Sequence, residues 1–172
     1  FRSVFPEKFV QALTSAGWLS ALIPEEYGGS NLSLVEASVI MEEINRAGGN
    51  SGACHGQMYV MGCVVRHGSQ AQKEALLPKI ASGELRMQSM AVTEPTTGSD
   101  TTQLKTFAER KGDRYIVNGQ KVWTSRLQHS DYMLLLARTT PLAEVTKKSE
   151  GMSIFIVDLR ESIGKGLEVR PI

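Results

Sequence analysis

Apolar residues in the first half of the chain recur at the three- and four-residue spacing of amphipathic helices. The first of these segments follows Pro6, a residue suited to a helix start. Two later segments begin with capping boxes, in which a serine stands three residues ahead of a glutamate or glutamine, at Ser33 and Ser69. Pro78 is expected to break or kink the last segment. The pattern therefore predicts a small helical domain over residues 1–85.

The pattern changes in the second half to short apolar or alternating runs that are separated by turn residues. These runs are residues 87–93, 104–110, 114–118, 120–125, 131–138, 153–159 and 167–172. Asn118-Gly119 is typical of a two-residue hairpin turn, with Tyr115–Val117 and Lys121–Trp123 as the flanking strands. Short strands joined by hairpin turns favour an antiparallel β-sandwich or barrel over residues 86–172. The chain is therefore expected to be an α+β protein, and a Rossmann dinucleotide fold is excluded.

Composition narrows the classes of function. The 172 residues are 41% hydrophobic and 22% charged, with a formal net charge of +1, and acidic and basic residues are interspersed. No basic stripe indicates nucleic-acid binding, and the longest apolar run, MLLLA, is too short to span a bilayer.

Two cysteines, Cys54 and Cys63, are the only ones in the sequence. On one helix they would lie about 13 Å apart along the axis, which is too far for a disulfide. This favours a reducing compartment, either the cytoplasm or the mitochondrial matrix. No histidine stands at ligand spacing from either cysteine, so the sequence predicts no metal site.

The candidate chemistry lies in the stretch Met90–Asp100, which reads MAVTEPTTGSD. It is rich in hydroxyl groups, and Gly98 allows a ligand to approach the backbone closely. Such donors suit an anion or a ring rich in carbonyl groups, although a polar loop that caps its own backbone would look similar. Further on, Asn118–Ser125 reads NGQKVWTS, which places Trp123 on an expected strand. A tryptophan on a strand is by itself typical of a core position.

The two motifs VTEPTTGSD and NGQKVWTS, preceded by IPEEYGG, together resemble the acyl-CoA dehydrogenase family over essentially the whole chain. The resemblance implies α,β-dehydrogenation of an acyl-CoA thioester with hydride transfer to FAD. It also implies a homo-oligomer of two or four subunits and an electron-transferring flavoprotein as the usual acceptor. FAD would lie between the β domain and the helices, and the family's second helical domain is absent from this chain.

The resemblance assigns the first motif to the flavin and to the substrate. Met90, Val92 and Thr93 would line the flavin ring, and the hydroxyl and main chain of Thr93 would bind its pyrimidine edge. Gly98 and Ser99 would lie by the pyrophosphate. Ser99 would also touch the pantetheine arm of the acyl-CoA.

The second motif is assigned to the flavin ring in the same way. Trp123 would pack beside the isoalloxazine, and Thr124 and Ser125 would donate near the flavin nitrogen that receives the hydride. This chain departs from the family at two positions. The family often has an aromatic residue in place of Met90 and a small or amide residue in place of Arg126, so substrate shape and flavin tuning are left open.

By the same resemblance, the glutamate that removes the α-proton lies beyond Ile172, and Phe1 and Ile172 look like cut ends of a longer protein. The chain would then be catalytically incomplete. Glu94, which precedes Pro95, is expected to be a structural carboxylate that binds backbone amides. Two alternatives stay open: an acyl-CoA oxidase or related flavin monooxygenase on the same fold, and a non-catalytic acyl-CoA-binding module. The hydroxyl donors of both motifs count against the module.

Overall fold

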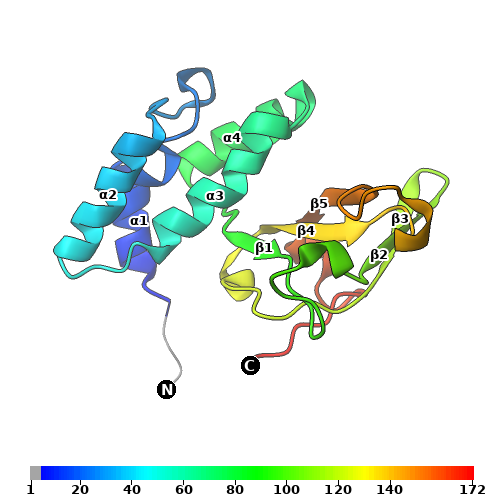
Figure 1. Ribbon diagram of the computed structural model, residues 1–172. Coiled ribbons are helices and arrows are strands. Elements are labelled where there is room, and N and C mark those ends of the chain that lie inside the picture. The colour runs from blue at the N-terminus through cyan, green and yellow to red at the C-terminus, as the bar shows by residue number, and fades with distance from the viewer. Residues whose placement is uncertain (1–4) are drawn as a thin grey trace. The chain divides into compact units, whose positions relative to one another are not determined.

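Four α-helices build the first of two units in the computed structural model, which describes residues 5–172 (Figure 1). This unit comprises Phe1–Gln88 and Gln128–Asp131. Its helices are α1 (Glu7–Ser15), α2 (Leu34–Arg46), α3 (Gly52–His67) and α4 (Gln70–Ser82). The helical character expected for the N-terminal region is confirmed.

Both predicted capping boxes are formed. At the start of α2, the Ser33 amide donates to the Glu36 carboxylate over 2.8 Å. At the start of α4, the Ser69 amide donates to Gln72 Oε1 (2.9 Å) and the Gln72 amide donates to Ser69 Oγ (3.2 Å). Each pair satisfies backbone donors that the first helical turn leaves without intrahelical partners, so the two helices begin where the sequence predicts.

Of the two effects predicted for Pro78, a break is wrong because α4 continues through the proline, and a kink stays a prediction. The helix continues to Ser82. Leu77 and Ile80, on either side of the proline, are fully buried in the first unit. Their burial stabilises the helix enough to offset the one backbone hydrogen bond that a proline removes.

The core of the first unit is apolar and includes one thiol. Side chains from α1, the turn after it and α3 form one cluster: Val10, Leu13, Leu19, Ala53 and Cys54. Cys54 and Cys63 are both free thiols, and burial raises the pKa of Cys54 to about 11. Cys54 is therefore protonated and packs as a small apolar residue.

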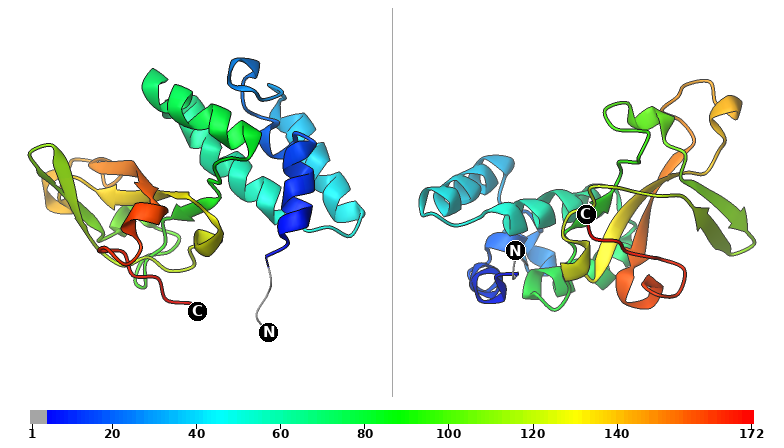
Figure 2. Two further views of the ribbon diagram at one scale, coloured as in Figure 1. Left: turned by 180° about the vertical axis from the view of Figure 1, so that it is seen from behind. Right: turned by 90° about the horizontal axis from the view of Figure 1, so that it is seen from below.

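A mixed five-stranded sheet forms the second unit, which comprises Ser89–Leu127 and Tyr132–Ile172 (Figures 1 and 2). Its strands are β1 (Ser89–Ala91), β2 (Phe107–Lys111), β3 (Arg114–Asn118), β4 (Tyr132–Arg138) and β5 (Met152–Asp158), and the short helix α5 (Leu159–Ser162) follows. β4 pairs with β5 along its whole length and is the central strand of the unit. Its buried side chains pack with Ala91, Leu127 and Leu159.

Strand pairing differs from the purely antiparallel sheet that the sequence predicts. β1 and β2 both run parallel to β4, whereas β2–β3 and β4–β5 are antiparallel. Parallel neighbours need a long connection between them, and residues 92–131 connect β1 to β4 while residues 112–131 connect β2 to β4. The order of a helical region followed by a sheet is confirmed.

The hairpin turn predicted at Asn118-Gly119 is also wrong. The tight turn lies at Gly112-Asp113, where Lys111 pairs with Arg114. Residues 120–125 form no strand, and neither do residues 167–172. Gly119 instead allows its backbone to lie close to Thr106, because a Cβ at position 119 would be 2.3 Å from Thr106 Oγ1.

β3 lies at the end of the sheet order and pairs only with β2 among the described residues. All five of its residues are exposed. They include Tyr115, Ile116 and Val117, so both faces of this edge strand carry apolar side chains that meet solvent.

Removing the cap of α4 should destabilise the first unit. We expect Ser69→Ala to lower the free energy of unfolding by about 1 kcal/mol, because the Gln72 amide loses its acceptor. Ser69→Thr keeps a hydroxyl at the cap and should lower it much less. Urea unfolding followed by far-UV circular dichroism measures both, and equal effects of the two variants would contradict a capping role for Ser69.

Candidate functional site

All eight residues that the sequence assigns to a cofactor site lie in the second unit, on two segments. The first segment begins in β1 and continues into the loop after it, and the second follows β3. They are Met90, Val92, Thr93, Gly98, Ser99, Trp123, Thr124 and Ser125.

Two hydrogen bonds join these segments. The Val122 amide donates to the carbonyl oxygen of Thr93 over 2.9 Å. The Lys121 ammonium donates to the carbonyl oxygen of Val92 over 2.8 Å. The structure therefore brings Thr93 of the first motif next to Trp123 of the second.

Glu94 is the buried centre of this junction. Its carboxylate accepts hydrogen bonds from the amides of Lys105 (2.7 Å) and Thr106 (2.9 Å). It also forms an ion pair with Lys121 over 2.9 Å, in which the side chains of Glu94 and Lys121 are only 4% and 8% exposed. The expectation of a structural carboxylate that binds backbone amides is confirmed.

These contacts keep the pair charged in spite of its burial. Burial by itself raises the pKa of Glu94, but the hydrogen bonds that the carboxylate accepts outweigh burial and lower the pKa to about 2. Burial also lowers the pKa of Lys121, although Glu94 favours its charged form. Two ionised groups are therefore held together inside the second unit.

The loop beyond Glu94 begins with a tight turn and becomes open to solvent at Gly98. Glu94 and Thr97 exchange backbone hydrogen bonds across Pro95 and Thr96, which closes a tight turn. The buried Thr97 hydroxyl donates to the Gln103 carbonyl over 3.3 Å. Gly98 comes next, and a Cβ placed there would meet no atom within 4 Å. The backbone at Gly98 therefore faces open space, into which a ligand can come close.

Trp123 is neither on a strand nor in the core, so the sequence-based strand prediction is wrong at this residue. Its side chain is 70% exposed and its φ is 60°. Arg126 also has a φ of 60°, so the chain turns sharply twice within four residues. A bulky residue with positive φ is an outlier that its surroundings must hold in place.

The hydroxyl groups of the site are available as donors. Within residues 5–172, the side chains of Thr93, Ser99, Thr124 and Ser125 make no hydrogen bond to another protein group. Together with an exposed indole and an open glycine, they supply the aromatic surface and the fixed donors that a flavin ring and its phosphates require. The residues present therefore fit FAD.

Two further features of the described chain stand apart from this site. The part of the chain that the structure describes contains no group of three or more metal-ligating side chains, and none of its helices has the length and apolarity needed to cross a membrane.

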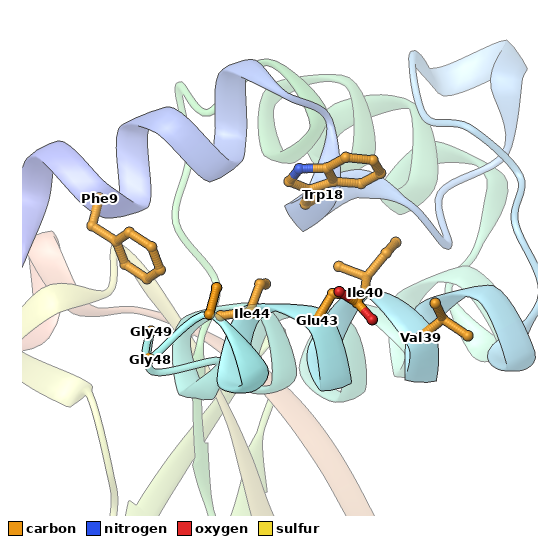
Figure 3. A pocket seen from close by; sticks show the side chains of 9 residues that line it. Phe9, Trp18, Val39, Ile40, Glu43, Ile44, Gly48 and Gly49 are labelled. Carbon is orange, nitrogen blue, oxygen red and sulfur yellow. The ribbon is translucent and has the colours of Figure 1, made fainter.

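An apolar cleft of about 690 Å³ lies in the first unit, with Phe9 of α1 and Trp18 on one side and Val39, Ile40 and Ile44 of α2 on the other (Figure 3).

Comparison with known families identifies the chain. Residues 2–84 match the family model "Acyl-CoA dehydrogenase, N-terminal domain", and residues 89–172 match "Acyl-CoA dehydrogenase, middle domain". The chain belongs to the acyl-CoA dehydrogenase family. This is a family of flavoprotein oxidoreductases that act on acyl-CoA in fatty acid and amino acid catabolism.

Individual acyl-CoA dehydrogenases and one solved oxidase are similar to this chain over most of its length. The mitochondrial isovaleryl-CoA dehydrogenase of Pongo abelii is 40% identical over 153 residues, which are 88% of this chain and 36% of that protein. The crystal structure of an acyl-CoA dehydrogenase from Geobacillus kaustophilus has 33% identity and a TM-score of 0.81, covering 91% of this chain and 41% of that one. The prolyl acyl carrier protein oxidase AnaB has 26% identity and a TM-score of 0.73, covering 90% and 41%. The chain thus spans about two fifths of the length of these relatives.

Sequence reasoning missed two buried cations of this acyl-CoA dehydrogenase chain. Lys121 was expected to lie on a strand, and only its contacts with Val92 and Glu94 reveal its role. Arg138, at the end of β4, is buried and donates to the carbonyl oxygens of Thr102 (2.6 Å) and Glu150 (3.0 Å). It therefore fixes two loops. No local signal marks either residue, because Lys121 lies 27 and 29 residues from Glu94 and Val92, and Arg138 lies 36 residues from Thr102.

The Glu94 pair should make stability depend on acidity in a defined range. Folding lowers the pKa of Glu94 from 4.5 to about 2, so the ionised carboxylate stabilises the folded state fully above pH 4.5. This stabilisation is lost as the pH falls toward 2. We expect Glu94→Gln to lower the free energy of unfolding by about 3–5 kcal/mol near neutral pH and by progressively less in acid. Denaturant unfolding across this range measures the difference.

The exposed Glu109 gives the matched control. Its partner Lys111 is also exposed, so Glu109→Gln should change stability by less than about 1 kcal/mol at any pH. A wild-type advantage over Glu94→Gln that stays constant down to pH 2 would contradict the role of the ionised carboxylate.

Proposed function

We propose that this chain is the part of a flavin-dependent acyl-CoA dehydrogenase that holds the flavin ring, and that the whole protein oxidises an acyl-CoA thioester at its α,β bond. The observation that carries this proposal is the junction of the two motifs. Thr93 and the residue before Trp123 are directly hydrogen-bonded, so an exposed indole lies close to a chain segment that offers a free hydroxyl.

FAD, when bound, accepts the hydride that leaves the β-carbon of the thioester. The hydroxyl and amide of Thr93 would bind the pyrimidine edge, where they stabilise the negative charge that develops on reduction. Trp123 would cover one side of the ring, and Thr124 and Ser125 would donate near the reacting nitrogen. These donors are fixed by the fold, so they need no reorganisation during the reaction.

The remaining assigned residues would hold the ends of the two ligands. Met90 and Val92 would line the ring beside Thr93. Gly98 and Ser99 would bind the pyrophosphate, since the open glycine backbone and the free hydroxyl can both approach phosphate oxygens. Ser99 would also contact the pantetheine arm of the substrate.

The base that takes the α-proton is not assigned to this chain. Glu94 is excluded as the base because its carboxylate is buried, ion-paired and bonded to two amides, which lowers its basicity. The relatives are more than twice as long as this chain, and we propose that the base comes from the part of the protein that corresponds to their remaining length.

Absorption spectroscopy tests the function directly. We expect the whole protein, loaded with FAD and desalted, to retain a flavin band that bleaches when a set of acyl-CoA thioesters is added without oxygen. A retained band that no acyl-CoA bleaches would overturn the dehydrogenase reaction. Loss of all flavin on desalting would overturn the cofactor site.

Thr93→Val removes the proposed donor hydroxyl at nearly constant volume. We expect it to slow flavin reduction by acyl-CoA about 100- to 1,000-fold, equivalent to about 2.7–4 kcal/mol, because one fixed donor to the developing charge is lost. Stopped-flow absorbance measures this rate. Thr96→Val, which changes an exposed hydroxyl in the neighbouring turn, should leave the rate unchanged, and equal rates for wild type and Thr93→Val would contradict the role of Thr93.

An oxidase is the second candidate function, and the similarity to the acyl carrier protein oxidase AnaB favours it over a non-catalytic binding module. An oxidase would keep the same flavin contacts and differ in its access to oxygen. Fast reoxidation of the substrate-reduced protein in air would support the oxidase. Slow reoxidation in air, with fast reoxidation by a protein acceptor, would support the dehydrogenase.

The partners are proposed on the same family likeness. We propose that an electron-transferring flavoprotein accepts the electrons and that the whole protein assembles as a homodimer or homotetramer. The free thiols of Cys54 and Cys63 agree with a reducing compartment, which would be the cytoplasm or the mitochondrial matrix. The relatives are named for different acyl groups, such as isovaleryl-CoA and glutaryl-CoA, so the likeness does not assign the acyl group of this protein.

A further inference from the structure

One peptide group links the buried ion pair to the proposed flavin site. The carbonyl oxygen of Val92 and the N–H of Thr93 belong to the same planar peptide group. Lys121 Nζ lies 2.8 Å from that carbonyl oxygen. The described residues contain no cis peptide bond, so the N–H of this group points away from its carbonyl oxygen. Lys121 therefore lies behind the amide that Thr93 presents.

This amide is available to a ligand. Within residues 5–172, the Thr93 N–H donates to no other protein group. The carbonyl oxygen of Thr93 is held by the Val122 amide over 2.9 Å. The backbone on both sides of the Thr93 amide is therefore anchored while the amide itself stays free.

We propose that Lys121 and Glu94 set the affinity of the bound flavin for electrons, by polarising the peptide group between Val92 and Thr93. This proposal rests on the proposed function, because it takes the Thr93 amide to bind the flavin edge. Lys121 and Glu94 are positioning residues, since they act through the peptide group and do not touch the ligand themselves.

The two residues act in opposite directions. A positive charge at the carbonyl oxygen draws electron density along the peptide group and makes its N–H a stronger donor. The Glu94 carboxylate lies 2.9 Å from the same ammonium group and opposes this effect. Both side chains are almost fully buried, so water screens neither charge well. A stronger donor stabilises the more negative, reduced form of a flavin more than the oxidised form.

The opposing charges allow a test that separates tuning from simple structural support. If the pair only held the two segments together, loss of either partner would loosen the site and shift the potential in the same direction. If it tunes the peptide group, the variants should shift the potential in opposite directions. Lys121→Met leaves the carboxylate on its two amides, and Glu94→Gln leaves the ammonium on the Val92 carbonyl.

The measurement is the midpoint potential of FAD bound to the whole protein, titrated against a reference dye without oxygen and at one fixed pH. We expect Lys121→Met to weaken the preference for reduced over oxidised FAD about tenfold, or about 30 mV for a two-electron couple. Glu94→Gln should strengthen this preference by a smaller factor, because the carboxylate contacts the ammonium group whereas the ammonium group contacts the Val92 carbonyl oxygen directly. The double variant has no unpaired buried charge, and its midpoint potential should lie between those of the wild-type protein and Lys121→Met.

The exposed pair of Glu109 and Lys111 supplies the controls, because Glu109→Gln and Lys111→Met make the same chemical changes at the surface. Both should leave the potential unchanged. If Lys121→Met does not fold, the midpoint potentials of the wild-type protein, Glu94→Gln and the double variant still test the proposal. The proposal would be overturned if the midpoint potentials of Glu94→Gln and of the double variant shifted in the same direction, or if neither shifted. The proposed function would still stand in that case if acyl-CoA bleaches the flavin of the wild-type protein. Wild-type protein without flavin would overturn the proposed function as well.

Discussion

A buried ion pair between Glu94 and Lys121 holds together the two segments that carry every candidate flavin contact. The partners are 27 residues apart in the sequence, and neither lies on a strand. Burying two charges is unfavourable unless the remaining hydrogen-bonding capacity of both groups is used. Two backbone amides also donate hydrogen bonds to the carboxylate, and the Val92 carbonyl oxygen accepts a second hydrogen bond from the ammonium group. The geometry of the site therefore depends on this small polar network.

Features that act through near neighbours in the sequence were predictable. A capping box joins residues three apart, so Ser33 and Ser69 could be assigned without a tertiary structure. Glu94 could be assigned because a carboxylate in a loop before a proline commonly binds nearby amides, and the amides it binds lie only 11 and 12 residues on. The residue content of the two motifs also identified the candidate site.

Features that depend on distant parts of the chain were not predictable. The parallel pairing of β1 with β4 follows from where the intervening residues go, and no local pattern encodes it. Gly119 looked like a turn residue, but its lack of a side chain allows contact with Thr106. Trp123 looked like a core residue because aromatic residues are frequent on strands, yet its positive φ directs the chain away from the sheet. Local propensity and tertiary contact give different answers at these positions.

The open edge of β3 has a consequence for how this chain behaves in solution. An exposed strand that carries Tyr115, Ile116 and Val117 offers free backbone groups and apolar side chains to any similar strand, which is the usual start of edge-to-edge aggregation. The adjoining hairpin, residues 109–114, carries three cations (Arg110, Lys111 and Arg114) and the two carboxylates that pair with them (Glu109 and Asp113), so its net charge is +1 and two approaching edges would repel each other through this excess positive charge. Colloidal stability of the second unit thus depends on ionic strength, since salt screens this repulsion and leaves the apolar attraction in place.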